Sequence, residues 1–291
     1  MYPPTFSYER AESVEHAVEL LDKHEDREIE VLAGGHSLVP LMKSGLTDVE
    51  TVVDIGRLDE VRGVEVGDDT TRIGSLTSYA ELTDDEALWD RATVIAEAAS
   101  EIGDVQVRSM GTIGGNLAHA DPAADLPAAV LAADARLHIH GSSGERQVDV
   151  DDFFEGIFTT ALESTELLTW IEVPDYGPTD AGAYVKKRSP SSGYAMVGVA
   201  AVLWTDGETI ESARVAVNGV LDHAVRLDPV EEALEGAPLE TSALADAAEH
   251  AGTDLDERRI MSDEQASSEY RKGLLPAYTE RALSAAHERI A

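Results

Sequence analysis

The sequence predicts an α+β fold, and three observations support that prediction. Stretches in which apolar and polar residues alternate recur along the 291-residue chain, and a period of two is typical of half-buried strands. Other stretches carry apolar residues three and four positions apart, which is the spacing of amphipathic helices. A turn-rich stretch at 174–178 interrupts both patterns with prolines and a glycine. We therefore expect one part over residues 1–176 and another over 177–291.

Helix and strand patterns alternate over about residues 1–58. Ser13 precedes a helical pattern and has the type of side chain that caps a helix N-terminus. Gly45 and Gly56 follow a short helical stretch and a short strand-like stretch, where a glycine commonly ends an element. The expected elements are a helix over 14–21, a strand over 29–33, a short helix over 38–43 and a strand over 51–55.

Residues 59–176 continue with both patterns. The turn residues at 67–69 separate two short strand patterns and indicate a hairpin, and Gly103 closes a long apolar helix pattern. The expected elements are strands over 61–66 and 71–74, helices over 78–82, 92–102 and 126–133, a strand over 136–140, a capped helix start over 149–154 and a strand over 167–173.

Residues 177–291 are expected to form an antiparallel sheet packed with helices. Glycine-containing turns join three strand patterns, and three helical patterns come after them. The expected strands cover 182–187, 197–204 and 212–220, and the expected helices cover 229–234, 244–251 and 268–290.

The chain is strongly acidic, with 57 Asp and Glu against 22 Lys and Arg and a net charge of −35. Nucleic-acid binding is excluded as a function, because phosphate contacts need a basic patch. The carboxylates are spread through the periodic segments, which disfavours a disordered acidic tail. Dispersed acid with only five lysines predicts a salt-loving host, where salt screens the self-repulsion of the folded chain.

The chain contains no cysteine. Disulfides, thiolate catalysis and iron–sulfur clusters held by this chain alone are therefore excluded. No stretch reaches the ~18–20 uninterrupted apolar residues of a membrane span. The first four residues lack a basic and an apolar region, so the sequence predicts no signal peptide and a cytoplasmic location.

A pair of glycines directly follows the strand expected over 29–33. The segment Leu32-Ala33-Gly34-Gly35-His36-Ser37 offers consecutive main-chain N–H groups between a strand and a helix start. Glycine lacks Cβ and tolerates positive φ, so it lets such donors approach a pyrophosphate closely. Taken alone, a Gly-Gly turn after a strand is more often structural than functional.

A second glycine pair lies about 80 residues further along, and it can let main-chain N–H groups approach a pyrophosphate for the same reason. The loop Gly111-Thr112-Ile113-Gly114-Gly115-Asn116 adds the polar side chains of Thr112 and Asn116. A branched side chain at Gly114 is expected to occupy phosphate space. Neither loop has the Rossmann Gly-x-Gly-x-x-Gly spacing or the Gly-Lys-Ser/Thr of a P-loop. Two such loops therefore favour a dinucleotide site more than either loop does alone.

These loops and the residues near them resemble one family. Residues 33–38, 102–108 and 111–116 closely resemble the FAD-binding medium subunit of molybdenum hydroxylases. That family includes the flavoprotein subunits of aerobic carbon monoxide dehydrogenase and of bacterial xanthine dehydrogenase. The resemblance extends over the whole chain and includes 214–220 in its second part.

The resemblance implies a PCMH-type FAD-binding domain with two subdomains, about 1–58 and 59–176, followed by a C-terminal domain over 177–291. FAD is expected between the two subdomains. The implied diphosphate-binding residues are Val31, Leu32, Ala33, Gly34, Gly35, His36, Ser37, Leu38, Thr112, Ile113, Gly114, Gly115 and Asn116. The other implied contacts are Asp125 on the ribityl or ribose portion, the main chain of Leu168 beside the isoalloxazine ring, Tyr194 on the ring face and Lys187 beside the ring.

Structural roles remain alternatives for some of these residues. Asp125 can cap the helix that follows it, and Tyr194 can be a core aromatic. The histidines lack the carboxylate–histidine spacing of a known metal site, so no metal is expected on this chain. His138 and His140 are expected on one face of a strand, alternating with apolar core residues.

The resemblance also implies a function. In these enzymes a molybdenum cofactor on a large subunit oxidises the substrate, and electrons pass through [2Fe–2S] clusters on a small subunit to FAD on the medium subunit and on to an external acceptor. Of these cofactors, the chain is therefore expected to carry only FAD. It is expected to join the large molybdenum-binding subunit and the small iron–sulfur subunit in a dimer of heterotrimers. No catalytic acid or base is assigned. A self-contained FAD-dependent oxidoreductase of the same fold, or a non-catalytic flavin-binding protein, is the alternative.

Overall fold

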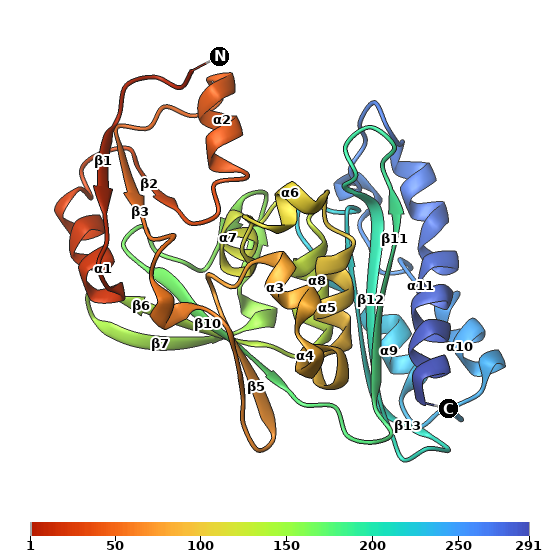
Figure 1. The fold of residues 1–291 in the computed structure, drawn as a ribbon. Helices are drawn as coiled ribbons and strands as arrows, with labels where there is room; N and C mark the ends of the chain where they lie inside the picture. Colours follow the sequence, from red (N-terminus) through yellow and green to blue (C-terminus); the bar gives the residue numbers. More distant parts are fainter. Residues whose placement is uncertain (1, 291) are drawn as a thin grey trace.

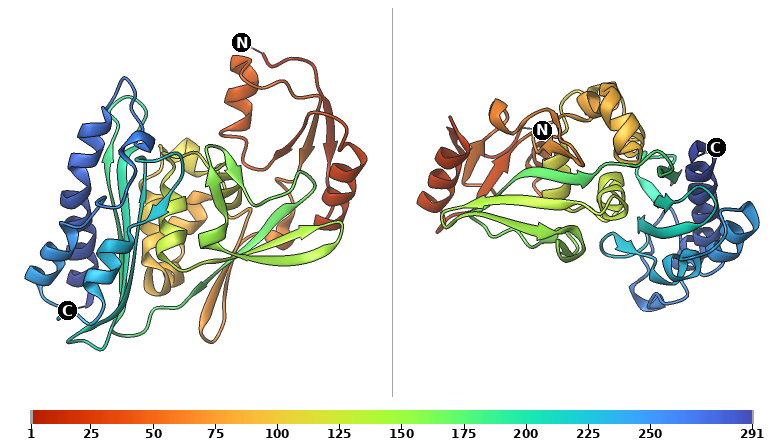
Figure 2. Two further views of the ribbon diagram at one scale, coloured as in Figure 1. Left: turned by 180° about the vertical axis from the view of Figure 1, so that it is seen from behind. Right: turned by 90° about the horizontal axis from the view of Figure 1, so that it is seen from below.

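The computed structural model describes residues 2–290, and these residues form four sheets with helices around them. Figure 1 shows the N-terminal strands at one end, a central sheet with its helices in the middle, and a C-terminal sheet covered by helices at the other end. The two views of Figure 2 show the same order from behind and from below. The predicted α+β class is confirmed.

The N-terminal sheet has three parallel strands in the order β1-β3-β2. These strands are β1 (Ser7–Arg10), β2 (Ile29–Leu32) and β3 (Thr51–Asp54). The predicted cap is confirmed, because the Ser13 hydroxyl accepts a hydrogen bond from the main chain of α1 (Val14–Lys23). α2 (Leu38–Ser44) ends at Gly45 in the left-handed region. Strand β1 was not predicted because it has a single apolar residue, Tyr8, and no alternation.

The central sheet has five strands in the order β4-β5-β10-β6-β7, and neighbouring strands run antiparallel. Its strands are β4 (Val64–Val66), β5 (Thr70–Gly74), β6 (Arg136–Gly141), β7 (Gly144–Asp149) and β10 (Leu167–Pro174). Six helices accompany it: α3 (Tyr79–Asp84), α4 (Glu86–Arg91), α5 (Thr93–Ser100), α6 (Val105–Arg108), α7 (Ile113–His119) and α8 (Asp125–Ala132). A small hairpin of β8 (Phe154–Gly156) and β9 (Thr159–Thr160) follows β7.

Two predictions in this region are wrong. Residues 149–154 do not begin an α-helix, because a single 3₁₀ turn over Val150–Asp152 leads directly into β8. Residues 112–116 are not a loop. Thr112 is the N-cap of α7, and its side chain accepts a hydrogen bond from the Gly115 N–H, so both glycines lie in the first turn of a helix.

The C-terminal sheet has the order β11-β12-β13-β14 and is antiparallel throughout. Its strands are β11 (Ala181–Arg188), β12 (Ala195–Thr205), β13 (Ile210–Asn218) and β14 (Val225–Arg226), and its helices are α9 (Asp228–Leu234), α10 (Thr241–Ala248) and α11 (Ser268–Ile290). Figure 1 shows α11 against one side of β11 and β12, and α5 and α8 against the other. Successive side chains of β12 therefore enter two different cores, Ala200 and Val202 toward α8 and Val199 and Ala201 toward α11. Burial of both faces explains why β12 is almost continuously apolar.

No helix within residues 2–290 is both long enough and apolar enough to cross a membrane.

Candidate functional site

The two glycine segments, far apart in sequence, are packed against each other. An added Cβ at Gly34 would lie 2.1 Å from the carbonyl oxygen of Met110 and 2.9 Å from the Cα of Gly111. An added Cβ at Gly115 would lie 3.6 Å from the side chain of Ala33. Only glycine allows the backbones to approach so closely at Gly34. The predicted pairing of the two segments is thus a direct contact in the fold.

The first segment presents free main-chain donors. Within residues 2–290, the N–H groups of Gly34, Gly35, His36 and Ser37 donate no hydrogen bond to protein atoms. Gly35 has φ +72°, a conformation that favours glycine. Consecutive N–H groups around such a turn form a concave nest that binds anions. This arrangement fits a phosphate group.

The free donors border an open pocket at the carboxyl edge of the N-terminal sheet. The pocket has a volume of about 410 Å³. Strands β2 and β3 run parallel with Leu32 opposite Asp54, so the segments that follow both strands meet at this edge. Ligands of parallel sheets bind in crevices outside the carboxyl ends of the strands. Three residues at the end of β3 and just after it also line the pocket and were not predicted: Asp54, Gly56 and Arg57.

The second segment does not present a comparable set of free donors. The Ile113 N–H donates to the carbonyl of Thr77 at 3.0 Å, and the Gly114 N–H donates to that of Ser75 at 2.8 Å. Asn116 differs, since its Nδ2 donates to the Tyr79 hydroxyl at 3.0 Å while its buried Oδ1 has no partner among residues 2–290. Among the side chains of this segment, the Asn116 amide oxygen is therefore a polar atom left open to a ligand.

Gly114 has a packing role that the sequence did not reveal. An added Cβ there would lie 2.4 Å from the Cβ of Ser75 and 2.7 Å from its carbonyl oxygen. The expectation that a side chain at Gly114 fills phosphate space is corrected, because atoms of Ser75 already occupy that space. We predict that Gly114→Ala lowers the free energy of unfolding of the apoprotein by about 3 kcal/mol through overpacking, measured by urea denaturation.

The matched control for Gly114→Ala is Gly156→Ala. An added Cβ at Gly156 meets nothing within 4 Å, so this variant should unfold at the wild-type urea concentration. A Gly114→Ala protein that is as stable as wild type but has lost its flavin would restore the phosphate interpretation.

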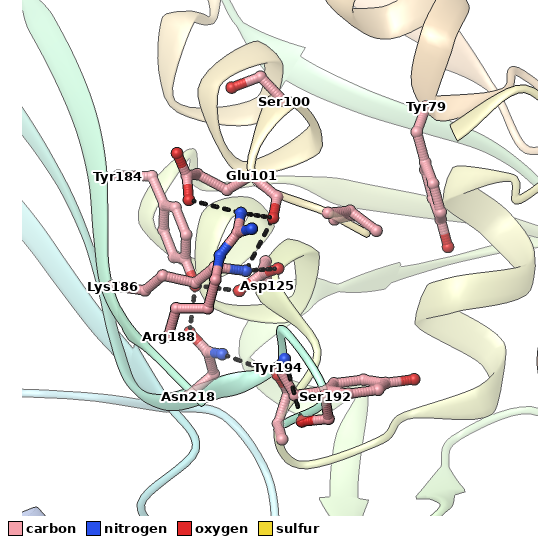
Figure 3. Close-up of polar contacts among 12 residues, drawn as sticks. Tyr79, Ser100, Glu101, Asp125, Tyr184, Lys186, Arg188, Ser192, Tyr194 and Asn218 are labelled. Atoms are coloured by element: carbon pink, nitrogen blue, oxygen red, sulfur yellow. Dashed lines mark hydrogen bonds and ion pairs between the residues drawn. The ribbon is translucent and has the colours of Figure 1, made fainter. Parts of the chain in front are cut away.

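Asp125 lies in a buried polar cluster between the central helices and the C-terminal sheet, shown in Figure 3. Its Oδ2 is 2.7 Å from the Nζ of Lys186, and its Oδ1 accepts a hydrogen bond of 2.5 Å from the Tyr184 hydroxyl. The Lys186 ammonium also donates to the carbonyl oxygen of Glu101 at 2.9 Å. Burial raises the pKa of the Asp125 carboxyl, and the Lys186 ammonium acts in the opposite direction.

The alternative in which Asp125 caps a helix is wrong. Ala124 holds the N-cap position of α8, and Asp125 is the first helical residue. Its two carboxylate oxygens are engaged by the C-terminal sheet instead. Each oxygen has a second lone pair, so a contact to a flavin remains chemically open to this residue.

Tyr194 lies on the turn between β11 and β12 and is 46% exposed, so the alternative of a core aromatic is wrong. Partial burial of the ring, together with the charges of Asp121 and Asp125, raises the pKa of Tyr194. Figure 3 shows Tyr194 and Tyr79 reaching toward the same region beside the cluster. Burial raises the pKa of Tyr79 to about 12, so both phenols are neutral at ordinary pH.

Leu168 and Lys187 lie in different surroundings. Leu168 is buried in β10 beside a break in the strand register between Leu168 and Trp170. Lys187 alternates with Lys186 along β11 and so extends to the opposite face of the strand. On that face Val185 packs against the core formed with α11. The lysine in the polar cluster is therefore Lys186, which was missed.

The histidines on β6 follow the predicted alternation. Leu137 and Ile139 are fully buried, while His138 and His140 are part-exposed between them. Within the described part of the chain, no three His, Cys, Asp or Glu side chains come together as a metal-binding group.

Comparison with known proteins shows the family to which the chain belongs. A family model described as the FAD binding domain in molybdopterin dehydrogenase matches residues 4–176. The chain belongs to this family. A second model, the CO dehydrogenase flavoprotein C-terminal domain, matches residues 183–286. The predicted family is confirmed, and FAD is the cofactor of this flavoprotein, as expected from the resemblance.

Relatives match this flavoprotein along its full length. The glyceraldehyde dehydrogenase medium chain of Sulfolobus acidocaldarius is 35% identical over 97% of this chain and 99% of its own. The carbon monoxide dehydrogenase medium chain of Hydrogenophaga pseudoflava is 34% identical, with 100% of both chains covered. A solved structure of carbon monoxide dehydrogenase from the latter organism superposes with a TM-score of 0.94 at 35% identity, covering 100% of both chains. The flavoprotein is accordingly an oxidoreductase subunit.

Proposed function

We propose that this flavoprotein is the FAD-carrying electron-transfer subunit of a molybdenum hydroxylase complex, placed between the [2Fe–2S] clusters of a partner subunit and an external acceptor. The observation that carries the proposal is the full-length match to medium chains of dehydrogenases. The lack of cysteine supports it, because this chain cannot supply the thiolate ligands of such clusters. When bound, FAD supplies the redox chemistry, and the protein supplies position and electrostatics.

The chain's own residues are proposed to bind and orient the cofactor. The free N–H groups at 34–37 hold the diphosphate, and Asn116 accepts a hydrogen bond from a ribityl or ribose hydroxyl through Oδ1. The remaining proposed contacts with FAD are Val31, Leu32, Ala33, Leu38, Thr112, Ile113, Gly114, Gly115, Asp125, Leu168, Lys187 and Tyr194. Lys187 faces away from the Asp125 cluster, so its proposed contact lies on the other face of β11.

The proposed partners are a large molybdenum-binding subunit and a small iron–sulfur subunit, assembled as a dimer of heterotrimers. The test is co-expression of a tagged copy of this chain with candidate partners, followed by analysis of the purified complex for iron and molybdenum. Substrate should reduce the flavin of the complex, whereas the isolated chain should bind FAD without oxidising substrate. Oxidation of a small alcohol by the isolated chain would instead favour a self-contained oxidoreductase.

Tyr194 provides a prediction about the flavin ring. Tyr194→Ala should shift the visible absorption spectrum of bound FAD and weaken FAD binding roughly fivefold, because a packed aromatic pair contributes about 1 kcal/mol. The measurement is titration of the apoprotein with FAD, followed by absorption. Tyr270→Ala is the control, since Tyr270 on α11 is exposed to the same 46%. An unchanged flavin spectrum in Tyr194→Ala would remove this residue from the site.

A further inference from the structure

Arg57 is a basic residue in the glycine-lined pocket, in a chain where basic side chains are scarce. The chain has 22 Lys and Arg against 57 Asp and Glu. Arg57 is exposed, and it forms no ion pair or side-chain hydrogen bond with any residue in 2–290. Most arginines among residues 2–290 form an ion pair with a carboxylate, whereas Arg57 does not. Its guanidinium is therefore available to a ligand in the pocket.

The backbone around Arg57 is tied to the glycine segment. The Ile55 N–H donates to the carbonyl of Leu32 at 3.0 Å, and an added Cβ at Gly56 would lie 3.1 Å from the carbonyl oxygen of Ala33. Arg57 is therefore held beside the same turn that presents the free N–H groups. Its position does not depend on a mobile partner.

The acidic residue of the pocket lining, Asp54, is already engaged. Asp54 accepts a hydrogen bond of 2.5 Å from the Tyr8 hydroxyl and one of 2.8 Å from the Gly56 N–H. These bonds hold the carboxylate within its own turn, and Asp54 forms no ion pair with Arg57. The other ionisable side chain of the lining, His36, contacts the carbonyl oxygen of Gly34 through Nδ1. Arg57 is thus the permanent positive charge of the lining.

We propose that Arg57 is a specificity residue that pairs with the phosphate groups of the cofactor and so selects the dinucleotide over the bare flavin. The N–H groups at 34–37 donate hydrogen bonds but carry no net charge, whereas a diphosphate brings negative charge into a chain of net charge −35. A guanidinium supplies both the charge and a planar pair of donors that matches phosphate oxygens. The proposal rests on the assignment of FAD to this pocket.

The test is titration of full-length apoprotein with FAD and, separately, with riboflavin, which lacks phosphate. We expect Arg57→Gln to raise the dissociation constant for FAD roughly tenfold, as for loss of a charge-assisted hydrogen bond, and to leave riboflavin binding unchanged. Arg57→Lys should recover part of the loss, because it restores the charge without the planar donors. Arg27→Gln is the matched control: Arg27 is exposed and precedes the opposite end of β2, and the variant makes the same change in net charge.

The outcomes separate this proposal from the proposed function. If Arg57→Gln binds FAD as tightly as wild type, or as tightly as Arg27→Gln when that variant is also weakened, the pairing is refuted while the electron-transfer role stands. An equal loss of FAD and riboflavin binding would also refute it, by showing a general disturbance of the pocket. If the wild-type chain binds riboflavin as tightly as FAD, the dinucleotide site itself fails, and both proposals fall.

Discussion

Replacing Lys186 with methionine is expected to lower the free energy of unfolding by about 3–5 kcal/mol, because it leaves the buried carboxylate of Asp125 without its counter-charge. The two side chains are only 2% and 5% exposed, and their charged atoms are 2.7 Å apart. Water cannot solvate the remaining charge, so the folded state must bear it or take up a proton. Urea denaturation at constant salt measures the change.

Two comparisons test whether the expected loss of stability comes from the buried charge. Lys23→Met breaks an exposed pair with Glu9, whose side chains are 58% and 30% exposed, and it should cost less than about 1 kcal/mol. In the Lys186→Met background, Asp125→Asn removes the stranded charge while keeping an oxygen for the Tyr184 hydroxyl. Part of the lost stability should therefore return.

Equal losses for Lys186→Met and Lys23→Met would show that the Asp125 cluster is no more sensitive than a surface pair. Failure of Asp125→Asn to recover any stability would show that lost packing, and not the stranded charge, is responsible. Because the cluster joins α8 to β11, a true charge effect also means that it fixes the C-terminal sheet against the central helices.

Local patterns were sufficient to predict the glycine turn that lines the pocket. Gly34 and Gly35 follow a strand whose alternation is visible in the sequence, and their free N–H groups follow from that position. The loop conformation predicted for the second segment was wrong for a physical reason. Gly114 and Gly115 are poor helix formers, yet the Thr112 cap and the contact with Ser75 place them in a helix. Tertiary packing of this kind has no signal in the local pattern.

Local patterns could not predict Lys186 or Arg57 for a related reason. Lys186 and Lys187 are adjacent and identical, and only the register of β11 decides which one meets Asp125. Strand alternation gives the face of each residue relative to Tyr184, but not which face meets α8. Arg57 has no motif at all. It becomes a candidate only when the fold shows that β3 ends beside β2 and that no carboxylate neutralises it.

The second large effect concerns salt: the chain is expected to be folded in molar KCl and to lose its folded circular dichroism spectrum in dilute buffer. With a net charge of −35, the compact state repels itself, and salt shortens the range of that repulsion from about 30 Å at 0.01 M to about 3 Å at 1 M. Acidic side chains on and beside α9 and α10 illustrate this charge repulsion. Five of them are exposed and form no ion pair within residues 2–290: Glu232, Glu235, Glu240, Asp246 and Glu249.

Neutralising these five carboxylates as glutamine or asparagine should lower the KCl concentration at the midpoint of refolding, because fewer charges need screening. Sucrose separates screening from general stabilisation, since it favours compact states by exclusion from the surface but does not screen charge. KCl should therefore restore the spectrum where sucrose does not. If the wild-type chain keeps its folded spectrum in dilute buffer and loses it in molar salt, the large excess of acidic residues is not an adaptation to a saline environment. If sucrose restores the spectrum as well as KCl does, the instability in dilute buffer does not come from charge repulsion.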